Sequence, residues 1–225
     1  MRFICLVCGM MGLCLQLNAQ NSAYLGLRGS YQISTANLTN TILGTSIPTR
    51  QVSGIATGVL FKYFPKPQLG LQWEANYSQK GFEQILTDTN EVFETSFDYL
   101  EFPFLMNIYL GKRRTQYFLN FGPYLAILLN EDTTGPQDSL SENLSYLYDE
   151  DRDRQSSFGL KIAAGIFRDF GFGGFQVDAH FTADISNFLD PNDLSVGIPD
   201  NSQNLVGGIT IAYLIPIGKP FDTVE

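Results

Sequence analysis

The stretch LGLQWEANYSQ, residues 69–79, alternates between apolar and polar side chains. One set comprises Leu69, Leu71, Trp73, Ala75 and Tyr77, and the other comprises Gly70, Gln72, Glu74, Asn76 and Ser78. Successive side chains of a β-strand point to opposite faces, so this stretch predicts a strand with one apolar and one polar face. Residues 175–185, FQVDAHFTADI, repeat the pattern.

The same two-residue period marks eight segments along the chain. They are residues 23–34, 52–63, 69–79, 97–110, 116–129, 156–167, 175–185 and 204–217. Connections after the second, fourth and sixth segments are short, whereas the others are roughly 17 to 26 residues long, and this alternation is typical of outer-membrane barrels. The sequence therefore predicts an all-β, eight-stranded antiparallel up-and-down transmembrane β-barrel.

The direction of the apolar face separates a membrane barrel from a soluble one. A soluble barrel would turn that face inward, but the interior of eight strands is narrow. The apolar sets hold much aromatic volume, including Trp73, Phe102, Phe121, Phe158 and Phe181. We therefore expect them to face lipid. Tyrosines near the strand ends could form interfacial girdles, although tyrosine also simply favours strands: Tyr31, Tyr63, Tyr77, Tyr109, Tyr117 and Tyr213.

The first residues resemble a targeting segment. Arg2 precedes an apolar run from Phe3 to Leu17, and Ala19 offers a small residue for cleavage, as in a secretory signal peptide. A retained anchor is the alternative, but the run is shorter than a spanning helix needs. We expect a signal peptide at 1–19, a barrel domain at 20–217 and a tail at 218–225. The mature chain then has no cysteine, since Cys5, Cys8 and Cys14 lie in the signal.

The charge of the mature chain bears on its partners. Removal of Arg2 from 14 basic residues leaves 13 against 23 acidic ones, a formal charge of −10. Such a surface disfavours nucleic acid. We expect the protein in the bacterial outer membrane, in contact with its lipid and lipopolysaccharide, inserted by the barrel-insertion machinery, and available to a secretion-system or surface partner.

The polar face predicts an ionic network inside the lumen. The residues assigned to it are Arg28, Glu74, Glu101, Lys161, Asp178 and His180. Enclosed charges must be paired or hydrated, because burying an isolated charge is costly. A plug of paired charges is the preferred interpretation, and proton transfer or a gated pore is the alternative.

Catalytic and metal chemistry have weak sequence support. His180 is the one histidine, and Asp178 and Thr182 share its face, but strand neighbours two residues apart do not form a triad. The acidic segment 130–155 contains Asp149, Asp151 and Asp153, yet it lacks the glycine and final glutamate of a calcium loop. We predict a protein that is not an enzyme, with no cofactor and no metal site. Divalent cations shared with lipopolysaccharide remain an alternative.

Three motifs resemble a known family. YLEFPFL at 99–105, FLNFGPYL at 118–125 and YSQKG at 77–81 are similar to the PorT-like outer-membrane barrel proteins of Bacteroidetes, in order and spacing over the mature chain. The motif residues are Tyr99, Glu101, Pro103, Gly122, Pro123 and Tyr124. The resemblance implies a barrel. The protein after which the family is named acts in protein secretion, so the resemblance also implies a role of that kind. Many such barrels end on an aromatic residue, whereas this chain continues past Ile217, so Tyr213 or Phe221 is the nearest candidate.

Pro103 and Pro123 each remove a ladder donor, which suggests bulges or bends that shape the barrel, with substrate contact as the alternative. Taken together, the patterns favour a non-enzymatic barrel whose extracellular loops bind a partner or support envelope integrity or protein secretion. A narrow pore for ions or small solutes is the alternative, and a membrane-embedded lipid hydrolase is a third reading.

Overall fold

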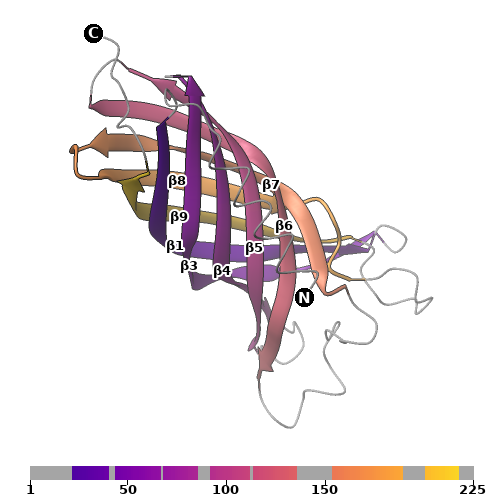
Figure 1. Ribbon diagram of the computed structural model, residues 1–225. Coiled ribbons are helices and arrows are strands. Elements are labelled where there is room, and N and C mark those ends of the chain that lie inside the picture. The colour runs from indigo at the N-terminus through magenta and orange to yellow at the C-terminus, as the bar shows by residue number, and fades with distance from the viewer. Residues whose placement is uncertain are drawn as a thin grey trace, which may run out of the picture.

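Eight antiparallel strands form a closed ring in the computed structural model (Figure 1). They are β1 (Ser22–Asn40), β3 (Thr49–Lys66), β4 (Leu69–Ile85), β5 (Val92–Leu110), β6 (Thr115–Thr134), β7 (Ser156–Asp169), β8 (Gly174–Asp184) and β9 (Asn201–Pro216). A short strand, β2 (Thr45–Ile47), pairs with the end of β1. The ring closes because β1 also pairs with β9, from Tyr24↔Pro216 to Thr39↔Asn201. The predicted eight-stranded up-and-down barrel is confirmed.

The structure describes residues 22–40, 44–66, 68–85, 92–111, 114–135, 154–189 and 201–217. The expected signal peptide, the tail with Phe221, and the acidic positions Asp149, Asp151 and Asp153 lie outside these residues. Within them, no helix is long and apolar enough to cross a membrane.

The two faces of the strands are sorted as the alternation predicts. Outward side chains are apolar and exposed, as at Leu27, Phe121 and Ile162, whereas Glu74 and Asp178 between such positions point inward and are buried. A one-residue shift in any strand would exchange these two sets, so the pattern fixes the register. The apolar face therefore forms a belt around the barrel, and the polar face lines its lumen.

Strand lengths depart from the expected segments at one end of the barrel. The short connections lie where predicted, but β4 continues to Ile85 and β5 already begins at Val92. Two of the expected long loops are thus mostly strand. Their inward side chains include Phe82 and Phe93, which are buried and keep a packed inner face beyond the polar part of the lumen.

The wall is uneven in height at this end, which we call the loop side. Strands β5 and β6 pair up to Glu94↔Thr134, whereas the last pair of β7 and β8 is Gly159↔Asp184. Figure 1 shows the β5–β6 hairpin reaching beyond the start of β7. The loop side is therefore high along β5 and β6 and low along β7 and β8.

The bulge predicted at the two prolines is not found. The β5–β6 pairing is interrupted between Pro103↔Tyr124 and Met106↔Phe121 without a change of register, and the shift lies between Asp98 and Tyr99. Loss of a donor leaves a gap in the ladder, but only an additional residue on one strand makes a bulge. The prolines therefore weaken the ladder locally and leave the register intact.

Two apolar layers cross the lumen, one near each end. The turn-side layer consists of Tyr24, Leu60, Phe64, Tyr109, Phe118, Phe167, Ala212 and Leu214. The loop-side layer consists of Ala36, Leu38, Phe82, Phe97, Tyr99, Tyr124, Ala126, Phe188 and Leu189. The charged residues of the lumen lie around and between these layers.

Candidate functional site

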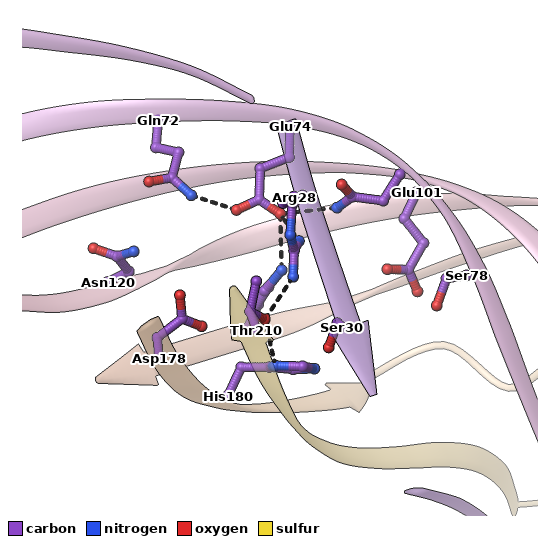
Figure 2. A network of polar contacts seen from close by, with 12 residues as sticks. Arg28, Ser30, Gln72, Glu74, Ser78, Glu101, Asn120, Asp178, His180 and Thr210 are labelled. Carbon is purple, nitrogen blue, oxygen red and sulfur yellow. Dashed lines mark hydrogen bonds and ion pairs between the residues drawn. The ribbon is translucent and has the colours of Figure 1, made fainter. Parts of the chain in front are cut away.

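The centre of the lumen is organised around the carboxylate of Glu74 on β4. Arg28 on β1 donates to Oε2, and Lys161 on β7 contacts the same oxygen at 2.8 Å. Asn76 donates to it at 2.8 Å, and Gln72 donates to Oε1. Figure 2 shows Arg28 of β1 meeting Gln72 and Glu74 of β4. One carboxylate thus bridges two cations in the middle of the barrel.

A hydrogen-bonded chain continues from Arg28 toward His180. The second guanidinium nitrogen of Arg28 donates to Thr210 Oγ1 at 2.9 Å, and this oxygen lies 3.1 Å from His180 Nδ1 (Figure 2). Thr210 Oγ1 accepts from Arg28 and keeps both its hydrogen and a second lone pair for Nδ1, so this contact suits either tautomer of the imidazole. His180 is therefore held as the end of a structural chain.

A second group lies toward the loop side, around Lys80 on β4. Its ammonium is 2.6 Å from Glu101 and 3.9 Å from Asp184. The rings of Tyr99 and Tyr124 lie 5.1 and 4.9 Å from the same nitrogen. Asp184 in turn accepts hydrogen bonds from Tyr124 Oη and, at 2.9 Å, from Asn204. Lys80 is enclosed by both carboxylates and aromatic faces.

A third group lies within the turn-side layer, around Lys62 on β3. Lys62 donates to Tyr109 Oη at 2.6 Å and to Gln176 Oε1, and its nitrogen is 5.0 Å from the ring of Phe118. Gln176 Nε2 donates to Asp178 at 2.7 Å. A fully buried ammonium is thus stabilised by oxygen acceptors and aromatic faces.

The predicted network residues all face the lumen, but they belong to three groups. Arg28, Glu74, Lys161 and His180 share the central one, Glu101 pairs with Lys80, and Asp178 joins Gln176. Lys80 was missed because the predicted strand ended at Gln79. The suggested trio of Asp178, His180 and Thr182 is not assembled, because His180 Nδ1 contacts Thr210 and Asp178 accepts from Gln176.

The family-motif residues shape the wall between β5 and β6. Tyr99 and Tyr124 flank Lys80, and Glu101 is its counter-ion. A Cβ at Gly122 would collide with the carbonyl oxygen of Phe104, so the close approach of these strands requires glycine there. Pro103 is inward and buried, whereas Pro123 is outward.

One tyrosine expected in the aromatic girdles lies elsewhere. Tyr109 is inside the turn-side layer, where it contacts Phe64 and Phe118. The other five side chains face outward: Tyr31, Tyr63, Tyr77, Tyr117 and Tyr213. Alternation from Glu101 already places position 109 on the lumen face, so the parity of the strand overrides the residue type.

A small cavity lies among the charged groups of the central lumen. Its volume is about 10 Å³, roughly the space of one water molecule. Its lining includes Arg28, Lys80, Glu101, Lys161 and His180. Among the described residues, no group of three histidine, cysteine or acidic side chains is placed to hold a metal ion. The lumen therefore resembles a packed, charge-paired core.

A family comparison agrees with this architecture. Residues 18–190 match the model of a family described as "outer membrane protein beta-barrel domain". The chain belongs to this family. Its lipid-facing apolar belt and polar lumen are those of an outer-membrane barrel, and the protein is located in the bacterial outer membrane.

Similar solved structures are small barrels of low sequence identity. OprG from Pseudomonas aeruginosa is 13% identical with a TM-score of 0.58, over 88% of this chain and 97% of that one. Ail of Yersinia pestis, in complex with the heparin analogue sucrose octasulfate, is 12% identical with a TM-score of 0.42, over 86% and 99%. No curated protein matches the sequence. At these identities the likeness to OprG establishes the barrel fold alone.

Proposed function

We propose that this protein is a closed, non-conducting outer-membrane barrel that acts through its loop side by binding a partner at the cell surface. The observation that carries the proposal is the filled lumen. Two apolar layers cross it, and the three charged groups around them pair with their own neighbours. A barrel of eight strands leaves an interior that side chains can fill completely.

Passage of an ion would require the turn-side layer to open. Tyr24, Tyr109 and Phe167 in this layer are at most 2% exposed. Tyr24 packs edge-on against Phe167 with ring centroids 5.7 Å apart, and Tyr109 does so at 6.3 Å. These rings come from β1, β5 and β7, so they meet across the lumen. An ion entering here would lose its hydration among apolar faces, which is costly.

The loop side offers the surface for recognition. The raised hairpin of β5 and β6 carries outward polar and acidic side chains beyond the apolar belt, among them Glu94, Asp98 and Asp132. Strand β6 ends at this side and β7 begins there, and β8 ends there and β9 begins. Loops on a rigid scaffold are where binding function concentrates. The PorT-like motifs support a partner in protein secretion, with envelope support as the broader role.

Single-channel recording of the refolded protein in planar bilayers tests the closed lumen. We expect no conductance steps above those of the empty bilayer. A matched variant, Tyr109→Ser with Phe167→Ser, removes two rings of the turn-side layer and serves as the opened control. Steps from the wild-type protein would show a conducting pore and contradict the proposal.

A deletion strain tests the partner. We expect altered secretion, surface binding or envelope integrity, restored by the intact gene. A chain in which residues 136–153 are replaced by a short glycine-serine linker should insert but fail to restore the phenotype. Unchanged secretion, binding and envelope integrity in the deletion strain would refute a loop-side role.

A further inference from the structure

The small cavity of the central lumen lies between two of the charged groups. Arg28, Lys161 and His180 line it from the group around Glu74, whereas Lys80 and Glu101 line it from the group nearer the loop side. In Figure 2, Glu101 lies to one side of Arg28 and His180. A ligand in this cavity would therefore contact both groups at once.

The wall of the cavity offers both hydrogen-bond donors and an acceptor. Lys80 Nζ and Glu101 Oε1 are 2.6 Å apart as an ion pair, yet both atoms are buried without a hydrogen bond of proper geometry among the described residues. Lys161 directs one N–H at Glu74 and, as an ammonium, carries others. A ligand here can thus accept from an ammonium and donate to a carboxylate.

The ionic side chains around the cavity balance each other. Arg28 and Lys161 share one carboxylate, and Lys80 lies between Glu101 and Asp184. A halide would add an uncompensated negative charge beside Glu101, and a metal ion would add a positive one beside Lys80. Either would be costly in a buried site. The cavity therefore suits a neutral ligand that both donates and accepts.

A small ligand can reach the cavity through the wall between β3 and β4. The β3–β4 ladder is interrupted between Gln51 and Ala56 of β3, and Gln32 of β1 donates across this stretch to the carbonyl of Gln79 on β4 at 2.7 Å. Gln32 and Ala56 also line the cavity. The outward side chains of Ser53 and Gln79 are polar, so this stretch lies at the edge of the apolar belt. Single side-chain contacts open more readily than a continuous ladder.

We propose that the cavity is a hydration site that binds one water molecule, which joins the two charged groups into one hydrogen-bonded network. The water accepts from Lys161 and donates to Glu101. Buried waters typically make about three hydrogen bonds to polar groups that otherwise lack partners, and their removal is costly. This inference goes beyond the proposed surface partner and is independent of it, because it concerns the lumen alone.

Two substitutions of equal shape at Ala56 separate loss of the water from the strain of added volume. Valine and threonine both fill the cavity beside Ala56, but only threonine supplies a hydroxyl in place of the water. Urea unfolding should give Ala56→Val an equilibrium constant for unfolding about tenfold above that of Ala56→Thr, because valine leaves buried charged groups unsatisfied. The same pair at Ala164 should show the reverse order, since a hydroxyl there faces lipid.

Nuclear Overhauser effects between water and methyl protons detect the water directly. In the protein reconstituted in nanodiscs with labelled threonine methyls, Thr182, which lines the cavity, should show a cross-peak to water. Thr210 is also buried but does not line the cavity, so its methyl serves as the control. The cross-peak of Thr182 should be lost in Ala56→Val. A signal relayed through the exchanging hydroxyl of Thr182 would persist in this variant.

Heat-modifiable migration on an unboiled gel confirms folding of every variant. Absence of the Thr182 cross-peak in the wild-type protein would overturn the proposal by itself, and so would a cross-peak that persists in Ala56→Val. Equal unfolding constants for Ala56→Val and Ala56→Thr would show a dry cavity and also overturn it. Stability that rises with chloride at constant ionic strength in the wild type, but not in Ala56→Val, would replace the water by an anion.

Discussion

Replacement of Glu74 by glutamine is the most informative perturbation of the lumen. The carboxylate is almost fully buried and is shared by Arg28 and Lys161, so Glu74→Gln leaves two enclosed cations without their common counter-ion. The amide preserves the shape and keeps one acceptor oxygen for Asn76, whereas its NH2 group faces the Gln72 side chain. The change therefore removes the charge at nearly constant volume.

The magnitude follows from the geometry. At the 2.8 Å separation of Lys161 Nζ and Glu74 Oε2, two unit charges interact by about 6 kcal/mol at an effective dielectric constant of about 20. Desolvation of both ions offsets much of this attraction. Removal of one partner from a buried pair costs about 3–5 kcal/mol, because the other charge stays enclosed. We expect a loss of free energy of unfolding in this range.

The assay is urea unfolding of the folded barrel, monitored by the fluorescence of Trp73 in the lipid-facing belt. Asp132→Asn provides a matched control, because it also neutralises a carboxylate but at an exposed position on β6. The control should change the free energy of unfolding by less than about 0.5 kcal/mol.

A double variant tests whether Glu74 and Lys161 stabilise the barrel through their interaction. Lys161→Met removes one of the stranded cations, so Glu74→Gln combined with Lys161→Met should lose less than the sum of the single losses, by about 0.5–3 kcal/mol. Strict additivity, or a Glu74→Gln barrel as stable as the Asp132→Asn control, would show that water rather than Glu74 neutralises the central cations.

Two further predictions use the same unfolding assay. Tyr124→Phe should destabilise the barrel by about 1.5–3 kcal/mol, because the hydroxyl donates to the charged carboxylate of Asp184, whereas Tyr117→Phe on the exposed face should have little effect; equal effects would contradict the buried bond. Gly122→Ala should destabilise by about 1–3 kcal/mol, because its Cβ meets the neighbouring strand, whereas Gly29→Ala points into open space and should stabilise by about 0.4–1 kcal/mol. Changes of the same sign would contradict the packing described.

Alternation was sufficient to predict the ring, the side of each strand that faces lipid, and the enclosure of the charges. It fixes the face of Arg28 or Lys161 because the period of a strand leaves two choices, and aromatic volume decides between them. Which charges pair is a different matter. Glu74 meets Lys161 across the lumen, and no local pattern reports the distance between strands that are not neighbours.

The sequence did not predict where the pairing between strands ends, and the positions of several side chains depend on it. Strands β4 and β5 continue past the apparent loop boundary, where Phe82 and Phe93 are buried on the inner face, and with the longer strand Lys80 enters the lumen. Phe188 lies in a segment without alternation, in which Ser186 and Asn187 precede it and Asp190 follows. Tertiary packing, and no local pattern, turns its side chain inward. Its neighbour Leu189 is the one local hint of a buried pair.

The central ion pairs have a consequence for how the barrel assembles. Arg28, Glu74 and Lys161 stand on β1, β4 and β7, so no hairpin contains two of them. A growing sheet carries these charges without partners until it curls far enough for opposite walls to meet. Partly curled sheets are therefore higher in free energy than the closed barrel. Pairing of β1 with β9 brings the opposite walls together in one step. Insertion should accordingly be cooperative, with open and sealed barrels separated by few stable intermediates.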